Sequence, residues 1–355
     1  MIRFLLCAFL FVFAFSFSGM AQSACELTLN NAQQEFEAGR FSSVPVLLQD
    51  CLSKNQNREW EQRAYLLLAE TYLLLQDNAK AEESYLKVIQ SNPEFVTDET
   101  RDPIDLVYLS KKFTAAPIFS FSGRFGLNTS FVRVINDVKI APQGSTTEKY
   151  SPNIGWQGGI GVDYHHTETL SASVELNYGF SSFSHQTKNL FQTGNYTLDF
   201  EEKQFGITIP LLIKYSATKG TLLPYGFAGL GLNFLVKDKV EMVLNNNAES
   251  PVLDYKDKRN SFTKSLILGG GLKYKWKLRY LFGEIRYSAG LSNMTNTSNR
   301  YDQINESWPY VDDDFRLDNL FVGVGYVHPL YKARKLKHAN TKSVLRRIGR
   351  RDHEK

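Results

Sequence analysis

The side chains of this sequence that could act together are seven isolated charges in its last two thirds. Each one stands on the polar side of a stretch in which apolar and polar residues alternate. They are Arg124, Asp163, Glu175, Lys214, Lys273, Glu284 and Arg286. An unpaired charge away from water is costly, so enclosed charges of opposite sign pair. We therefore expect an ion-pair network that fills the interior, with a narrow solute path as the alternative.

Apart from these charges, the sequence predicts no catalytic, cofactor or metal site and no enzyme activity. Its His and Cys spacings match no metal motif, and no signature of a Ser-His-acid set is present. The run Asp312-Asp313-Asp314, with Asp302 and Glu306 nearby, could gather Ca²⁺. Because the run lacks the spacing of a calcium loop, a solvated acidic loop is favoured.

The N-terminus is typical of an export signal. Arg3 precedes an apolar run over residues 4–17, and Gly19 and Ala21 are small residues before an expected cleavage at Gln22. The run is too short to cross a hydrocarbon core of ~30 Å. Residues 1–21 are therefore predicted to be a signal peptide, and the mature chain to enter an oxidising compartment.

Two cysteines remain after this cleavage, Cys25 and Cys51. Residues 23–25 offer a degenerate lipoprotein box, although Gln22 stands where a branched apolar residue is expected. In the other interpretation, Cys25 begins one helix and Cys51 ends the next, and antiparallel helices bring these ends together. A disulfide is favoured over lipidation.

Residues 22–92 have the apolar spacing of amphipathic helices. In the second half, large and small residues alternate at fixed intervals and a proline follows: Tyr65, Leu68, Ala69, Tyr72, Ala81, Tyr85, Val88 and Pro93. This pattern resembles a tetratricopeptide repeat. The first half matches less well. Because such repeats bind peptides or proteins, we expect a protein partner for this domain, and a simple spacer is the alternative.

Prolines interrupt residues 93–117, which are predicted to be a linker with one short helix near residues 104–113. Residues 332–355 form a basic tail with ten Lys and Arg residues and two acidic residues. The basic excess lies in this tail, so a nucleic-acid-binding face is excluded. The tail is expected to be solvated, with docking on the acidic segment 22–92 or capture of an acidic partner as alternatives.

Residues 118–331 alternate with a period of two, which predicts strands with one apolar and one polar face. Eight such segments are found, at 119–131, 154–164, 170–180, 205–215, 228–234, 265–274, 281–291 and 319–326. A soluble β-sandwich or a lipocalin-like barrel would also alternate. Glycines and isolated charges on the polar face favour a narrow lumen instead.

Two further patterns favour a transmembrane barrel. Aromatic residues gather near strand ends, as a membrane interface requires: Phe119, Tyr164, Tyr215, Tyr274, Trp276 and Tyr331. Short turns alternate with long polar loops near 135–153, 184–195, 245–261 and 295–316. The predicted fold class is mainly β, an eight-stranded antiparallel transmembrane β-barrel at 118–331 preceded by a small α-helical tetratricopeptide-like domain.

The glycine-rich strands WQGGIG at 156–161 and LGGGL at 268–272, and the ending FVGVGY at 321–326, resemble the porin-family, PorT-like outer-membrane β-barrel proteins of Bacteroidota. The resemblance covers residues 118–331 and implies an outer-membrane location, with roles in type IX secretion or gliding for some members. It implies no catalytic residues. The helical domain and basic tail depart from the simplest members.

From these patterns we expect a non-enzymatic outer-membrane barrel that anchors a protein-interaction domain. The helical domain and the C-terminal tail are expected in the periplasm. The expected partners are membrane lipid and a periplasmic protein, and no nucleic acid. A small solute channel is the alternative function.

Overall fold

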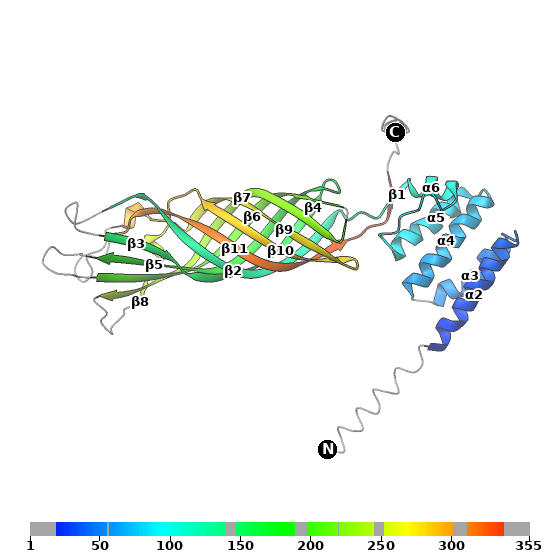
Figure 1. Cartoon of the computed structure of the whole chain (residues 1–355), viewed down its shortest axis with the longest axis horizontal. Coiled ribbons are helices and arrows are strands. Elements are labelled where there is room, and N and C mark those ends of the chain that lie inside the picture. The colour runs from blue at the N-terminus through cyan, green and yellow to red at the C-terminus, as the bar shows by residue number, and fades with distance from the viewer. Residues whose placement is uncertain are drawn as a thin grey trace, which may run out of the picture. The chain divides into compact units, whose positions relative to one another are not determined.

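The computed structural model describes residues 19–54, 57–138, 147–188, 197–218, 220–244, 252–300 and 311–336, without the side chains of 19–23, 147 and 244. The chain divides into two units, one of residues 117–330 and one of residues 1–116 with 331–355 (Figure 1). Most of the predicted signal peptide and of the basic tail lies outside the described residues. Among the described helices, none is long and apolar enough to cross a membrane.

The unit of residues 1–116 and 331–355 is helical. Its helices are α2 (Gly19–Glu37), α3 (Ser43–Lys54), α4 (Arg58–Leu74), α5 (Asn78–Ser91) and α6 (Ile104–Ser110). Side chains start two of them, since Asn57 accepts hydrogen bonds from the first turn of α4 and Asp77 accepts one from Lys80 in α5. Gly39 has a φ of 77° in the turn between α2 and α3, a conformation that favours glycine.

The repeat residues predicted in this unit lie on the facing sides of α4 and α5. Leu68, Ala69, Ala81, Tyr85 and Val88 are buried. The other two large residues, Tyr65 and Tyr72, are partly buried against the same apolar core, and Pro93 follows the end of α5.

The segment predicted as a linker packs into the helical core instead. Leu106 and Leu109 of α6 are buried beside Tyr85, and Phe95 and Phe113 pack around them. The short helix predicted near residues 104–113 is present as α6, and its apolar face packs against α4 and α5. The segment therefore adds to the core of the helical unit.

The first described residues of the basic tail also belong to the helical unit. Strand β12 (Arg334–Lys335) pairs with β1 (Phe113–Thr114), and Lys335 forms an ion pair with Glu82. Tyr331, expected in an aromatic girdle, lies in this unit and donates a hydrogen bond to Glu94. The placement of Tyr331 in the girdle was wrong because the chain has already left the last long strand.

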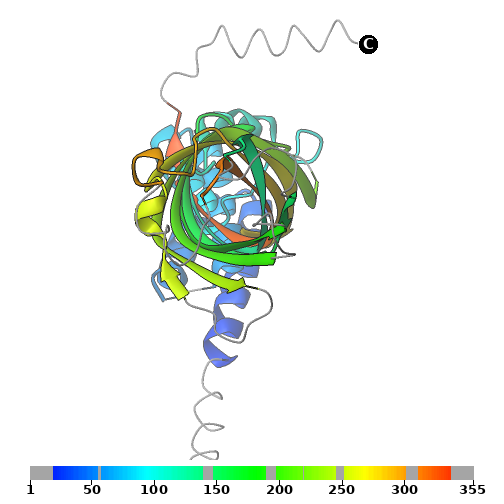
Figure 2. The same cartoon turned by 90° about the vertical axis from the view of Figure 1, so that its left-hand side faces the viewer.

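The unit of residues 117–330 is an antiparallel barrel. Eight described strands form its ring: β2 (Phe119–Asn136), β4 (Ile154–His165), β5 (Leu170–Lys188), β6 (Thr197–Ser216), β7 (Leu222–Leu244), β9 (Phe262–Trp276), β10 (Arg279–Gly290) and β11 (Asp314–Leu330). Each pairs with the next, and β11 pairs with β2 to close the ring (Figure 2). We call the end where β2 begins and β11 ends the terminal end, and the other the loop end.

The strands extend further toward the loop end than their apolar alternation indicates. Strand β7 covers residues 222–244 where the sequence predicted 228–234, and β5 continues to Lys188. Two short strands lie in the predicted loops, β3 (Thr147–Pro152) against β5 and β8 (Val252–Asp254) against β7. The 3₁₀ turns η1 (Lys256–Lys258) and η2 (Thr297–Asn299) follow. The extended parts of β6 and β7 also pack a small apolar cluster, in which Leu198, Phe200, Val240 and Met242 are buried with Tyr255.

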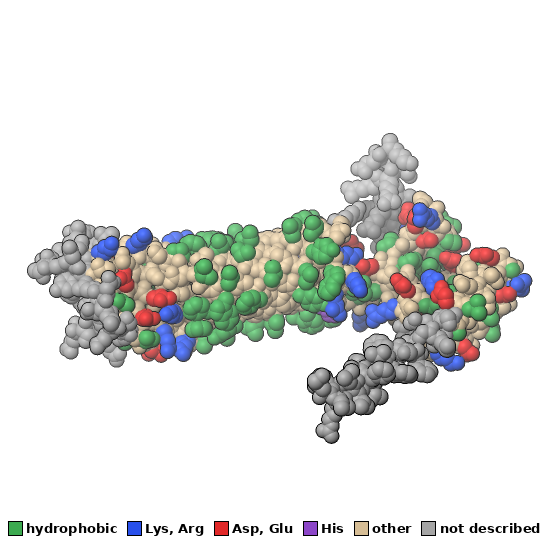
Figure 3. Space-filling view, turned by 60° about the horizontal axis from the view of Figure 1, so that its bottom comes forward, with side chains coloured by type: hydrophobic (Ala, Val, Ile, Leu, Met, Phe, Trp, Pro, Cys, Tyr) green, Lys and Arg blue, Asp and Glu red, His purple; other side chains and the backbone are tan. Residues whose placement is uncertain are grey.

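The outer wall of the barrel is apolar around its middle (Figure 3). Every barrel strand contributes exposed apolar side chains to it, among them Phe125, Ile160, Val174, Ile213, Leu230, Leu268, Ile285 and Val324. Of the predicted girdle, Phe119, Tyr164, Tyr215, Tyr274 and Trp276 are exposed. A continuous apolar wall of this kind is unfavourable in water and suits acyl chains.

Candidate functional site

The lumen holds the largest group of buried polar side chains in the barrel. Along β6, the inward residues change from Lys214 near the terminal end, through Thr208, to Glu202 near the loop end, and β5 and β7 add Glu175 and Asp238 to the two charged levels. We name these layers the terminal charge cluster, the lumen chamber and the loop-end charge cluster.

The terminal charge cluster is built on two carboxylates and two guanidinium groups. Arg124 donates to Glu175 at 2.6 Å and to Glu284 at 3.1 Å. Arg286 donates to the same two carboxylates, at 2.8 and 3.0 Å. All four side chains are at most 3% exposed. Each charge therefore contacts two opposite charges, which offsets its loss of hydration.

Lys214 extends the terminal charge cluster, with its ammonium 2.9 Å from Asp163 and 3.0 Å from Glu175. The structure thus brings together six of the seven predicted charges. The seventh, Lys273, forms no ion pair in the described part of the chain. It lies 4.7 Å from the centre of the Tyr225 ring and donates to Ser216 at 3.5 Å. It was expected in the network, but its ammonium points to a ring and a hydroxyl.

Tyr225 is a member of the terminal charge cluster that the sequence did not single out. Its hydroxyl donates to Glu284 at 2.8 Å. The signal was present, because Tyr225 has the same parity as the inward residues Gly229 and Gly231. The predicted strand began only at residue 228, so this inward tyrosine was missed.

The loop-end charge cluster was not predicted. Arg259, between η1 and β9, donates to Glu202 at 2.6 Å and lies 3.1 Å from Asp312. Asp238 lies 3.8 Å from the same guanidinium. Arg259 precedes its strand and follows no alternation, so the sequence contained no signal for it.

The acidic run is not a solvated loop, which corrects the sequence prediction. Asp312 is buried against Arg259, and burial raises the pKa of its carboxyl while that guanidinium acts in the opposite direction. Asp313 is buried too and accepts hydrogen bonds from the Val138 amide and the Tyr150 hydroxyl, both at 2.9 Å. Asp314 begins β11 and pairs with Arg300. The other two acids of the predicted group, Asp302 and Glu306, lie outside the described residues.

A metal site is not supported at this edge. The carboxylates of Asp137, Glu148 and Asp313 offer ligand atoms within 4.8 Å of one another. The donors on Asp313 already occupy its two oxygens, and acidic groups often gather without a cation. The grouping is therefore a feature of the loop-end structure.

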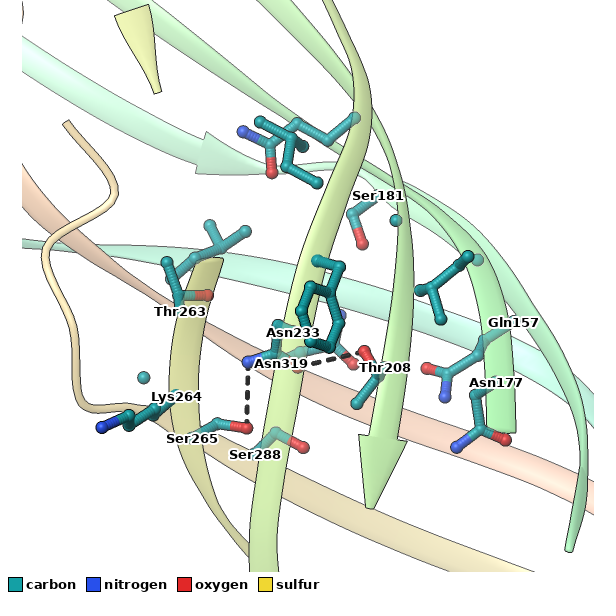
Figure 4. Close-up of a pocket in the computed structure, with 18 of the residues that line it drawn as sticks. Gln157, Asn177, Ser181, Thr208, Asn233, Thr263, Lys264, Ser265, Ser288 and Asn319 are labelled. Atoms are coloured by element: carbon teal, nitrogen blue, oxygen red, sulfur yellow. Dashed lines mark hydrogen bonds between the residues drawn. The ribbon is translucent and has the colours of Figure 1, made fainter. Parts of the chain in front are cut away.

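The lumen chamber lies between the two charge clusters and encloses about 130 Å³. Figure 4 shows side chains from several strands that project toward this space. Its amide and hydroxyl lining includes Asn128, Gln157, Asn177, Ser181, Thr208, Asn233, Thr263, Ser265, Ser288 and Asn319. Thr208 donates to Asn233 at 3.0 Å, and Asn233 donates to Ser265 at 3.2 Å. The alternation predicted a polar lumen, but only its charges were singled out.

In the helical unit, Cys25 and Cys51 form a disulfide bond, with their Cα atoms 5.6 Å apart. The indole of Trp60 donates to the Cys25 carbonyl at 2.8 Å. The bond thus connects the start of α2 to the end of α3 and borders α4.

Comparison with solved structures finds small outer-membrane proteins. The outer membrane protein OprG from Pseudomonas aeruginosa is 14% identical, covers 61% of this chain and 99% of its own, and has a TM-score of 0.35. Neisserial surface protein A is 13% identical over 60% and 97% of the two chains, with a TM-score of 0.30. A major outer membrane protein from Thermus thermophilus is 12% identical over 59% and 99%, with a TM-score of 0.32.

Comparison with curated proteins finds no match. The family model for the outer membrane protein beta-barrel domain matches residues 117–296, which is half of the chain. This range begins where the barrel unit begins and covers seven of the eight ring strands. The closed ring and the apolar outer wall agree with that match. The chain therefore belongs to the outer membrane protein beta-barrel domain family.

Proposed function

We propose that this protein is a non-enzymatic outer-membrane anchor, closed to ions, that presents its helical unit to a protein partner in the periplasm. The terminal charge cluster carries the proposal. In the ring, β5 and β10 are separated by three strands on either side, so they face each other across the full lumen. Glu175 on β5 and Arg286 on β10 are nevertheless 2.8 Å apart.

Two other contacts of this cluster each span one intervening strand of the ring. Lys214 on β6 reaches Asp163 on β4, and Tyr225 on β7 reaches Glu284 on β10. An eight-stranded barrel is only wide enough for side chains to fill it. The crossed contacts therefore support a plugged lumen and weaken the alternative of a solute channel.

The polar groups near the terminal end also support a role without catalysis. Ser120 and His165 share a hydrogen bond of 2.7 Å. The nearest candidate for a third member, Asp163, is bound to Lys214, and the chamber lining does not include Ser120. A nucleophile needs an oriented base and room for a substrate.

The experiment for the closed barrel is conductance in planar bilayers with the refolded full chain. We expect no steady channel current. Steady large conductance from a single inserted barrel would overturn the plug and favour the small-solute channel.

The periplasmic placement of the helical unit rests on three observations. They are the family match, the predicted export signal, and the alternation of short turns with long polar loops along the barrel. We expect a cysteine at the exposed Asn78 to react with a membrane-impermeant maleimide only after the outer membrane is permeabilised. A cysteine at the exposed Asp254, near the loop end, should react in intact cells. The reverse labelling pattern would refute this orientation.

The partner proposal rests on the tetratricopeptide-like packing of α4 and α5. The resemblance to PorT-like barrels suggests an envelope secretion or motility assembly as its source. A photo-crosslinker at Val46, which is 72% exposed on α3, should give one discrete adduct in intact envelopes. A crosslinker at Ile213 on the apolar wall is the control and should give none of the same mass. Identical adducts from both positions would argue against a specific partner.

A further inference from the structure

We propose that the lumen chamber binds a small uncharged ligand with several hydroxyl groups, of the size of a monosaccharide. The chamber encloses about 130 Å³. On the same measure a single water needs about 10–15 Å³, so the chamber has room for roughly ten waters. Such a volume suits a compact polyol and excludes a long chain.

The chamber places four hydrogen-bonding side chains side by side on neighbouring strands. Asn177, Thr208, Asn233 and Thr263 are direct cross-strand partners on β5, β6, β7 and β9. This row follows the wall of the barrel on one side of the cavity. It offers amide and hydroxyl groups that donate and accept, which is the recognition that a polyol requires.

Two amide side chains in the chamber have polar atoms without a hydrogen-bond partner in the described part of the chain. Asn177 is 1% exposed, and neither its Nδ2 nor its Oδ1 has a hydrogen-bond partner. Asn128 donates to the Phe180 carbonyl at 3.1 Å, but its Oδ1 has none. A buried polar atom without a partner costs about 1–3 kcal/mol. Both amides border the chamber, and rotation of their side chains away from Gly155 and Gly159 would bring these atoms to the hydroxyl groups of a ligand.

The charges around the chamber argue against a charged ligand. Arg286 is the charged side chain at its floor, and both Glu175 and Glu284 already neutralise it. Lys264 also borders the chamber, yet its side chain is exposed and its ammonium lies beside the exposed Phe262 ring, 5.9 Å from the centre. A phosphate or carboxylate would lose its hydration without gaining a free counter-charge.

Glycines keep the chamber open. Gly179 and Gly206 are cross-strand partners on β5 and β6 and leave that part of the wall without side chains. At Gly290 a Cβ atom would come within 2.6 Å of the Leu317 carbonyl oxygen, so this position excludes any larger residue.

The route proposed for the ligand is from the loop end, beside the loop-end charge cluster, which is also buried. The terminal charge cluster closes the other direction, as described above. Toward the loop end the lining includes Asn260, Ser292 and Met294, which lie in connecting segments and not in strands. A ligand would therefore reach the chamber past these segments.

The test uses the full chain in detergent micelles and isothermal titration with D-glucose, D-galactose, D-mannose and myo-inositol. At least one should bind saturably, and glucose 6-phosphate and gluconate should bind at least tenfold more weakly. Asn177→Leu should weaken the binding at least tenfold. Asn31→Leu, at an exposed position of α2, is the matched control and should leave it unchanged.

A second measurement keeps the test valid if Asn177→Leu fails to fold. Ser288→Cys should react with a small uncharged thiol reagent, and the bound polyol should slow that reaction at least fivefold. Failure of all four polyols to bind or protect would show that the chamber holds only water. Equal affinity for the charged sugars would overturn the assignment to uncharged ligands. Neither result affects the conductance expected of the closed barrel.

Discussion

Glu175 is the residue on which the barrel interior depends most. Its carboxylate contacts Arg124, Arg286 and Lys214, which come from three different strands. Removing one member of a buried ionic group leaves its partners charged and unpaired, and this costs more than the lost contact itself. The residue thus links distant strands through charge and not through apolar packing.

We expect Glu175→Ala to lower the free energy of unfolding of the barrel by about 3–5 kcal/mol. Urea titration of the full chain in lipid vesicles measures this. Glu201→Ala is the control, because Glu201 forms an exposed ion pair with Lys203 and accepts one long hydrogen bond from Ser182, and it should change stability by less than about 1 kcal/mol. Equal effects of the two variants would contradict the central role of Glu175.

At the same scale, Glu82 makes the docking of the tail sensitive to acid. The ammonium of Lys335, helped by Lys112, lowers the pKa of Glu82 below its usual value. The folded-state pKa of Glu82 is lowered, so its ion pair with Lys335 stabilises the docked tail fully at any pH above the ordinary carboxyl pKa. This stabilisation is lost as the pH falls through the lowered pKa. We expect the protection factors of residues 331–336 against hydrogen exchange to fall below about pH 4. In Glu82→Gln these protection factors should already be lower at neutral pH.

The disulfide is a connection between elements, since it joins the start of α2 to the end of α3. Closing a loop of 26 residues should stabilise the helical unit by about 3 kcal/mol. We expect the double variant Cys25→Ala, Cys51→Ala to show this loss in thermal unfolding. A reductant should reproduce the loss in the wild type and have no effect on the variant. A wild type that does not respond to reductant would favour lipidated Cys25.

The short β1–β12 pair completes the helical unit. Ala333 packs against its core, and the Leu336 amide donates to the Lys112 carbonyl at 2.8 Å. We expect truncation after Leu330 to make residues 93–116 sensitive to limited proteolysis. Truncation after Leu336 keeps these contacts and should preserve protection. Equal protection in both truncated proteins would show that the tail is not part of the unit.

For the whole molecule, the apolar outer wall determines whether the protein stays dissolved in detergent or in plain buffer. We expect the purified chain to be monodisperse in detergent and to aggregate when detergent is removed, as light scattering would show. Triple substitution of Ile160, Ile213 and Val324 by Ser, all outward-facing, should weaken insertion into vesicles. A monodisperse protein in plain buffer would instead fit a soluble sandwich.

The sequence alone was sufficient to predict the barrel, because the alternation that indicates each strand can be read within a few neighbouring residues. The period of two shows which side chains of each strand share a face, as in residues 154–164, where Ile160 faces outward and Gly161 inward. The same parity identified Arg124, Glu175 and Arg286 as lumen charges. It could not reveal Arg259 or the burial of Asp312, because these residues lie outside the alternating segments.

The tertiary structure decided which of those charges meet and what lies between them. Alternation assigns a face but not a height along the barrel, and strand tilt and register set the height. The contact between Glu175 and Arg286 joins strands that are opposite in the ring and 111 residues apart in sequence. The chamber exists for the same reason, since amides and glycines of separate strands reach one level only when the ring closes.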